Sequence, residues 1–211
     1  MYPDIFVVHF LSLLSKQRGL RVLDAGCGAG RNSIFLASEG LRVTAIDQSP
    51  QMLARGVAAA HEAGVEAAFL RGRLEALPLA DGSFDLLVCS NVVETMSLAA
   101  VQQAAREVWR VLRPEGHLLL VTAAQEGSDL DDTSEETPSP QTPFKARLSS
   151  KEELQRWFPG FRLEELLHLR LEFPASSPVR AQWALVARRL ASCLPDPPIG
   201  DLPAGQAGRQ A

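Results

Sequence analysis

The chain has 211 residues, a formal net charge of -4 and a pI near 5.6, and 46% of its residues are hydrophobic. This composition can fill a core on both faces of a sheet. The acidic balance gives no general attraction to polyanions, which argues against nucleic acid as a direct substrate. We expect one domain over residues 1–190, because α/β sheets of this size are commonly single. The Pro- and Gly-rich residues 191–211 are expected to form an unstructured tail.

The apolar run near the N-terminus predicts a packing helix over residues 5–16 rather than a signal sequence. It follows Asp4 instead of a basic leader, lacks a small-residue cleavage site and is too short to cross a bilayer. We therefore expect a packing helix within residues 1–18, in a cytoplasmic protein with no membrane partner.

Three cysteines, with no C-x-x-C pair among them, fit reduced thiols in a cytoplasmic protein. They are Cys27, Cys89 and Cys193. No set of His, Asp and Glu residues has the spacing of metal ligands, so no metal site is predicted.

Short apolar runs alternate with helical patterns, which predicts a parallel sheet with helices on both faces. The predicted strands are residues 21–25, 42–46, 66–70, 84–90, 116–122, 162–170 and 182–187. The predicted helices are residues 5–16, 32–39, 50–63, 99–112 and 149–157. Ser49 and Pro50 fit a helix start, and Pro114-Glu115-Gly116 predicts a helix end followed by a turn.

The first predicted strand runs directly into closely spaced glycines, Gly26, Gly28 and Gly30. Glycine has no Cβ, so its backbone can take positive φ and approach a ligand, while N–H groups of the following helix face a negative group. The second predicted strand ends at Asp47, roughly 20 residues after Gly26, where a carboxylate can accept hydrogen bonds from both hydroxyls of a ribose. The pattern indicates a binding loop for a nucleotide-like ligand.

Two plainer interpretations stay open for this loop. A strand-to-helix turn without a ligand also uses glycines, and a glycine pattern alone is weak evidence. Cys27 fits a small side chain packed behind the turn better than a nucleophile or a redox group. In an open sheet of this type the ligand lies outside the carboxyl ends of the strands, which selects residues 24–31, 47–48, 71–75 and 90–96.

Four motifs follow one another over roughly residues 20–123: VLDAGCGAGRNS, VTAIDQSPQML, RLEALPLADGSFDLLVCSNVVETM and REVWRVLRPEGHLLLV. In order and spacing they resemble the class I S-adenosylmethionine-dependent methyltransferases of the small methyltransferase-domain type. The resemblance implies a Rossmann-like α/β/α fold with a seven-stranded, mostly parallel sheet and an antiparallel edge strand. It also implies S-adenosylmethionine as the cofactor and a small-molecule methyl acceptor. It further implies that the helix within residues 1–18 is a covering helix over the cofactor mouth. Monomer and homodimer both stay open.

The resemblance implies a set of contacts to the methionine part of the cofactor. The loop that would hold this part comprises Gly26, Cys27, Gly28 and Gly30. Asp24 would help to position it from the strand end. Arg31 would pair with the cofactor carboxylate, or else lie along the helix surface. Asn91, just after the fourth strand, would offer its backbone carbonyl to the cofactor amino group.

The resemblance also implies contacts to the adenosine part. Asp47 would bind the ribose, and Gln48 would flank the adenine. The family often has an aspartate after the third strand that receives the adenine amino group, but Arg73 stands at that position here. Backbone N–H groups of Leu74 or Glu75, or the Glu75 carboxylate, would have to serve in its place.

Methyl transfer is an in-line displacement that needs alignment of the reactants and exclusion of water more than a dedicated acid. A thiolate acceptor needs no base, whereas an amine or hydroxyl acceptor has to lose a proton. Glu94 is the best-placed candidate for a catalytic base. The plain alternative is a surface carboxylate or one at a helix start.

The acidic residues 126–143 follow the fifth predicted strand and contain no Lys or Arg, which predicts a flexible insert. A lid or an acceptor-recognition loop is the functional hypothesis for this segment.

Two rival functions use the same glycine loop. A NAD-dependent oxidoreductase is typically marked by G-x-G-x-x-G, but Arg31 stands at the position of the last glycine. The other rival is a noncatalytic cofactor-binding protein or partner subunit, which the unusual Arg73 and the lack of an obvious base keep open.

Overall fold

The computed structural model describes residues 2–13, 19–124, 150–171 and 180–191. Its helices are α1 (Ile5–Leu13), α2 (Arg31–Ser38), α3 (Pro50–Glu62), α4 (Leu98–Val111) and α5 (Lys151–Trp157), with a 3-10 turn η1 (Val93–Thr95). Its strands are β1 (Arg21–Ala25), β2 (Arg42–Asp47), β3 (Ala67–Arg71), β4 (Phe84–Ser90), β5 (Leu112–Ala123), β6 (Phe161–Leu171) and β7 (Arg180–Arg189).

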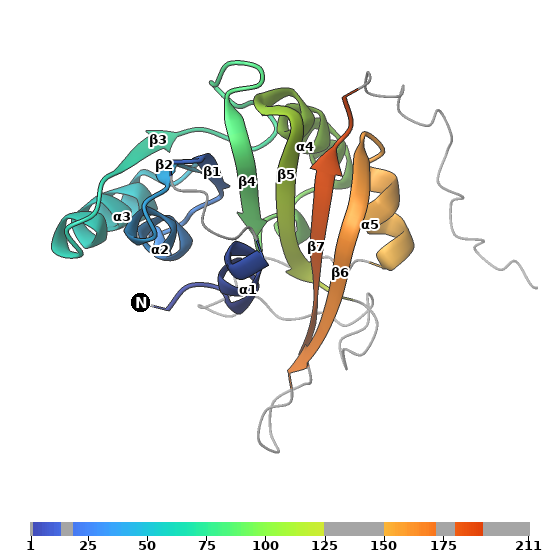
Figure 1. The fold of residues 1–211 in the computed structure, drawn as a ribbon, viewed down its shortest axis with the longest axis horizontal. Coiled ribbons are helices and arrows are strands. Elements are labelled where there is room, and N and C mark those ends of the chain that lie inside the picture. The colour runs from blue at the N-terminus through green and yellow to red at the C-terminus, as the bar shows by residue number, and fades with distance from the viewer. Residues whose placement is uncertain (1, 14–18, 125–149, 172–179, 192–211) are drawn as a thin grey trace, which may run out of the picture.

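The strands form one seven-stranded sheet in the order β3-β2-β1-β4-β5-β7-β6 (Figure 1). Neighbours from β3 to β5 are parallel, whereas β7 is antiparallel to both β5 and β6. The predicted Rossmann-like, mostly parallel sheet is confirmed. The structure places the antiparallel strand one position in from the edge, because β7 lies between β5 and β6.

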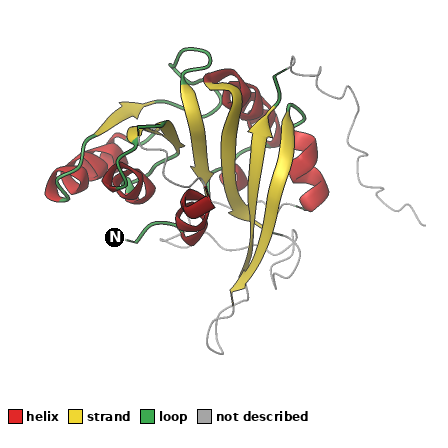
Figure 2. Cartoon of the chain, viewed as in Figure 1, coloured by secondary structure: helices red, strands yellow, loops and turns green. Residues whose placement is uncertain are grey.

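Helices cover both faces of the sheet, with α1 in front of the strands and α4 and α5 behind them in the view of Figure 2. Alternation along the strands sends neighbouring side chains to opposite faces. On β1, Val22 joins the cluster that includes Phe6 and Phe10 of α1, whereas Leu23 joins the cluster with Val101 of α4. The two clusters are the two apolar layers of the core.

The helix starts follow local capping chemistry. Ser49 Oγ accepts a hydrogen bond from the Met52 N–H, and Pro50 occupies the first turn of α3, as predicted. Ser150 and Glu153 form a capping box at the start of α5. These side chains satisfy N–H groups that have no partner within their helices.

The fifth strand begins earlier than predicted. Residues 114–116 were expected to form a turn before a strand at 116, but Leu112 already pairs with Phe84, and pairing resumes at Leu86 with His117. The residues between them bulge out of the ladder, and Glu115 takes a positive φ of 62° there. The predicted turn is thus an irregularity within β5.

The connection from β3 to β4, residues 72–83, contains no helix. It is held from α4 instead: Arg110 donates hydrogen bonds to the backbone carbonyls of Leu77 and Leu79, and it pairs with Asp81 and with Glu107. Glu107 also accepts the Leu77 N–H at 2.8 Å. The side chain of Arg110 lowers the pKa of Glu107 by hydrogen bonding.

The predicted acidic segment at residues 126–143 and all but the first residue of the predicted tail lie outside the described residues. Among the helices that the structure describes, none has the length and apolar character needed to span a bilayer.

Candidate functional site

The glycine loop after β1 is fixed to β2 by its backbone. The N–H groups of Gly26 and Cys27 both donate to the Ile46 carbonyl, at 2.7 and 2.9 Å. Gly26 has a φ of 75°, and Gly30, with a φ of 81°, directly precedes α2. The chain therefore turns sharply at the carboxyl end of β1 and presents backbone rather than side chains on its outer side.

Asp47 ties this loop to the end of β2. Its Oδ2 accepts the Gly28 N–H at 2.8 Å, and its Oδ1 accepts the Ser49 N–H at 2.8 Å. A carboxylate has about four lone-pair sites, so each oxygen keeps capacity for a further hydrogen bond. Asp47 is thus positioned by two backbone donors and can still accept two more.

A cavity of about 330 Å³ opens at the carboxyl ends of β1 to β4. This volume falls within the usual range for small-molecule sites. Its lining contains Gly26, Ile46, Asp47, Gln48, Gly72, Arg73, Leu74, Glu75, Asn91, Val92, Thr95, Met96, Ser97 and Ala100. The ranges selected from the sequence include most of these positions, but not Ile46 at the end of β2 or Ser97 and Ala100 at the start of α4.

Arg73 and Glu75 form an ion pair on one wall of the cavity. The Arg73 side chain is 65% exposed and that of Glu75 only 15%. Leu74 between them is buried in the core. The Glu75 carboxylate, which was predicted to serve in place of the usual aspartate at position 73, is therefore on the same wall as Arg73.

Asp24 lies behind the glycine loop, fully buried, and does not line the cavity. Its Oδ2 accepts the Ser33 hydroxyl at 2.5 Å. Burial raises the pKa of Asp24 to about 6, against the lowering effects of Ser33 and the Arg31 charge. Asp24 can therefore act on the site in two ways: it holds Ser33 of α2, and its negative charge lies close to the glycine loop.

Cys27 also faces inward, where it packs with Ala45, Leu53 and Phe69. Burial raises the pKa of its thiol well above the usual range, so the reactive thiolate is disfavoured. This placement agrees with a packing role behind the turn.

Glu94 is in η1 and points into the protein rather than out to the surface. It is only 7% exposed, and its Oε2 accepts the Thr122 hydroxyl of β5 at 3.1 Å. Burial raises the pKa of Glu94 to about 7. It is not among the residues that line the cavity, so its predicted role as a base stays a prediction.

Asp4 is the polar residue that sequence analysis missed at this edge of the sheet. It is 7% exposed, just before α1, and its Oδ2 accepts Arg31 Nη2 at 3.3 Å and Ser90 Oγ at 2.8 Å. Its N–H donates to Asn32 Oδ1 at 2.8 Å. The predicted covering helix is therefore anchored next to the glycine loop.

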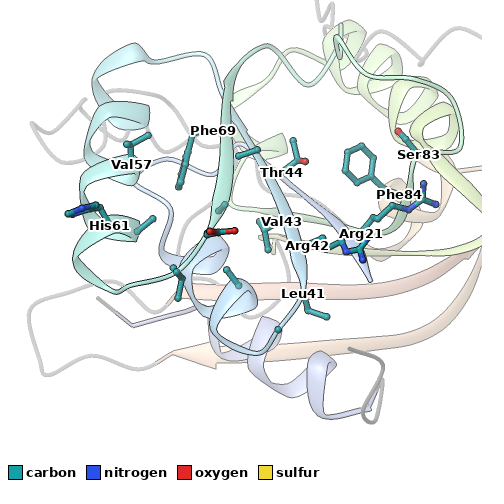
Figure 3. Close-up of a pocket in the computed structure, with 17 residues that line it drawn as sticks. Arg21, Leu41, Arg42, Val43, Thr44, Val57, His61, Phe69, Ser83 and Phe84 are labelled. Atoms are coloured by element: carbon teal, nitrogen blue, oxygen red, sulfur yellow. The ribbon is translucent and has the colours of Figure 1, made fainter. Parts of the chain in front are cut away.

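A larger hollow of about 1030 Å³ lies at the opposite edge of the sheet (Figure 3). Arg21, Arg42 and Phe84, at the amino ends of their strands, line it together with Val57 and His61 of α3. Its lining contains no glycine-loop residue, and its carboxylate, Glu66, precedes β3 instead of following a strand. The smaller cavity is the better candidate site, because the loop and Asp47 meet there.

Residues 23–120 match the family model described as a methyltransferase domain. The malonyl-[acyl-carrier protein] O-methyltransferase of Enterobacter lignolyticus is 39% identical over 117 residues, which cover 54% of this chain and 43% of that protein. The uncharacterized methyltransferase YcgJ of Bacillus subtilis is 34% identical over 145 residues, covering 68% of this chain and 56% of that one. The chain thus spans about half the length of the curated relatives it matches.

A SAM-dependent methyltransferase from Methanosarcina mazei has the same fold, with a TM-score of 0.72 and 23% identity over 90% of this chain and 99% of that one. This likeness shows a shared fold. The match of residues 23–120 to the methyltransferase-domain model supports the resemblance inferred from the sequence. Over residues 23–120 the chain is therefore similar to methyltransferase domains.

Proposed function

We propose that the protein transfers a methyl group from S-adenosylmethionine to a small-molecule acceptor. The observation that carries the proposal is that Gly26, Asp47 and Glu75 line one cavity at the carboxyl ends of the parallel strands. The match of residues 23–120 to a methyltransferase domain supports this cofactor over NAD. Arg31 supports it too, because it stands where a dinucleotide-binding loop has its last glycine.

The residues of the cavity fit such a cofactor. Gly26 leaves no side chain between the backbone and the cavity, and Asp47 keeps free lone pairs for the two ribose hydroxyls. Gln48 is exposed beside Asp47 and would flank the adenine. Glu75 would accept the adenine amino group, because a carboxylate accepts hydrogen bonds and the Arg73 guanidinium cannot.

The methionine end would lie along the glycine loop, next to α2. Arg31 would pair with the cofactor carboxylate. A guanidinium has five N–H donors, and the hydrogen bond from Arg31 to Asp4 uses one of them. The backbone carbonyl of Asn91 would accept the cofactor amino group. The charge of Asp24, behind Gly28 and Gly30, would favour the same cationic end.

When bound, S-adenosylmethionine supplies a methyl group on a positively charged sulfur. The chain then has to hold an acceptor in line with that methyl and exclude water. For a hydroxyl or amine acceptor, Glu94 is our candidate base, because a carboxylate whose pKa is raised to about 7 can take up a proton near neutral pH. Thr122 would hold Oε2 of Glu94 in place by donating its hydroxyl hydrogen bond.

Calorimetric titration tests the cofactor first. We expect the wild-type protein to bind S-adenosylmethionine and S-adenosylhomocysteine but not NAD, and Asp47→Ala to weaken both by at least about tenfold, because each lost charge-assisted hydrogen bond costs about 1.5 kcal/mol or more. Glu66→Ala is the matched control, since it removes a carboxylate from the larger hollow instead. Failure of the wild type to bind, or equal losses in both variants, would overturn the proposal.

An acceptor screen with methyl-labelled cofactor follows. Carboxylic acids belong in it beside thiols, amines and hydroxyls, because a relative that covers half of this chain is named for O-methylation of a malonyl group. Label transfer that Glu94→Gln abolishes only for acceptors that carry a proton would support the role of Glu94 as a base.

A further inference from the structure

Asp4 connects segments that are far apart in the sequence. Its Oδ1 accepts the Phe6 N–H at 3.0 Å, which caps α1, whereas its Oδ2 is shared by Arg31 at the start of α2 and Ser90 at the end of β4. One oxygen is enough for a helix cap. The contacts of the second oxygen with Arg31 and Ser90 are therefore not needed for the cap.

The contacts continue from Ser90 across the carboxyl edge of the sheet. Ser90 Oγ accepts Asn91 Nδ2 at 3.2 Å, and Asn91 Oδ1 accepts Gln182 Nε2 of β7 at 2.8 Å. Asn91 has a positive φ of 57°, and its N–H donates to the Val121 carbonyl at 2.9 Å. Hydrogen bonds to Ser90 and to Gln182 thus hold Asn91, whose backbone has a positive φ. Asp4 is at one end of this chain of hydrogen bonds.

We propose that Asp4 is a positioning residue that fixes Arg31 and Asn91 for the amino-acid end of the cofactor. This inference rests on the proposed function, which places the cofactor carboxylate at Arg31 and its amino group at the Asn91 carbonyl. Asp4 touches neither group of the ligand. It acts by holding the guanidinium of Arg31 on one side and, through Ser90, the backbone of Asn91 on the other.

The burial of the residues involved supports a fixed arrangement. The Asp4 side chain is 6% exposed and that of Arg31 is 40% exposed. A carboxylate this buried is costly unless it is hydrogen-bonded, so Asp4 keeps its partners close. An arginine this exposed would otherwise sample many rotamers, and the loss of that freedom on ligand binding would weaken affinity.

Two ligands separate positioning from general stabilisation. S-adenosylhomocysteine has the amino and carboxylate groups, whereas 5′-methylthioadenosine has the same adenosine without them. We expect Asp4→Asn to weaken S-adenosylhomocysteine about tenfold in calorimetric titration and to change methylthioadenosine binding by less than about twofold. Arg31→Gln should show the same selectivity, and Asp4→Asn should add little in the Arg31→Gln background.

Asp85→Asn is the matched control, because Asp85 is also a mostly buried carboxylate that accepts a backbone N–H, from Arg21 at 2.7 Å, but lies at the opposite end of β4. It should leave the ratio of the two affinities unchanged, whatever it does to thermal unfolding. If Asp4→Asn does not fold, Ser90→Ala tests the same link without touching the cap, and the same selective loss is expected.

Equal weakening of both ligands, or of neither, in a folded variant would overturn the role of Asp4 while the wild type still binds S-adenosylhomocysteine. A wild-type protein that binds neither ligand would overturn the proposed function itself, and the role of Asp4 with it. The two failures are therefore distinguishable from the wild-type titration.

Discussion

A Cβ atom added at Gly26 would overlap the side chain of Val92, whose Cγ2 is the nearest atom. Gly26 directly follows β1 and Val92 follows β4, so the loops after these two strands pack with the backbone of one against a side chain of the other. The positive φ of Gly26 is a second, independent reason for glycine at this position.

Gly26→Ala is therefore expected to abolish binding of S-adenosylhomocysteine and to lower the free energy of unfolding. Val92→Ala in the same chain removes the contacts with Cγ2 and Cγ1, and leaves a tight approach of 3.3 Å to the Cβ of residue 92 together with the backbone strain of about 1–2 kcal/mol. Urea denaturation of both variants checks this. The packing argument would be contradicted if Gly26→Ala were as stable as the wild type, or if the double variant were no more stable than Gly26→Ala alone.

The raised pKa of Glu94 predicts how stability depends on pH. The folded state holds a proton on Glu94 up to a pKa of about 7, whereas the unfolded chain releases it near the ordinary value of 4.5. The folded state thus binds more protons between these values, and this contribution to stability falls as pH rises from about 4.5 through 7. Glu94→Gln should be more stable than the wild type at pH 8, by up to about 3 kcal/mol, and similar to it at pH 4.5.

Thr122→Val provides the complementary measurement by denaturation at several pH values. The hydroxyl of Thr122 lowers the pKa of Glu94 by hydrogen bonding, so its loss should extend the pH-dependent range upward. An unchanged pH profile in both variants would mean that Glu94 is not buried in the way described.

The pH dependence of cofactor affinity is expected to follow Asp24. Its pKa of about 6 means that the carboxylate is mostly ionised at pH 7.5 and about nine-tenths protonated at pH 5. Because the ionised form favours the cationic end of S-adenosylmethionine, affinity should fall about tenfold over this range. Titrations of Asp24→Asn should show weaker binding at pH 7.5 and a flat profile. A slope that persists in the variant would assign the titration to another group.

Recognition of the adenine amino group is expected to depend on Glu75. The wild type should prefer S-adenosylhomocysteine over S-inosylhomocysteine, which has a carbonyl in place of the amino group. Glu75→Gln should lose most of this preference, because an amide can both donate and accept. Arg73→Gln is the control for loss of the ion pair alone, and it should keep the preference. Equal behaviour of the two variants would argue against a direct role for Glu75.

The elements of the sheet could be predicted because their signals are local. Alternating apolar runs mark the strands, and Ser49 with Pro50 marks the start of α3. Even the irregular start of β5 has a local sign in Pro114 and Gly116. Sequence analysis took that sign as a turn, because pairing of Leu112 with Phe84 depends on a strand far away in the chain.

The parts of the site that were missed depend on distant contacts. Nothing near Asp4 in the sequence indicates that its carboxylate meets Arg31 and Ser90, and the covering helix brings it there only in the folded chain. Glu94 shows the same limit: its place after β4 was visible, but η1 and the hydroxyl of Thr122, which turn it inward, were not. Which side a loop residue faces is set by what packs against the loop.

The brace that Arg110 provides for residues 72–83 links one wall of the cavity to the body of α4. Arg110 and Glu107 are neighbours on one helix face, and their hydrogen bonds reach Leu77 and Leu79, a few residues beyond Glu75. A small displacement of α4 along its axis would therefore carry the adenine side of the cavity with it. In hydrogen-exchange terms, the amides of this connection and of the last turn of α4 should open as one cooperative unit.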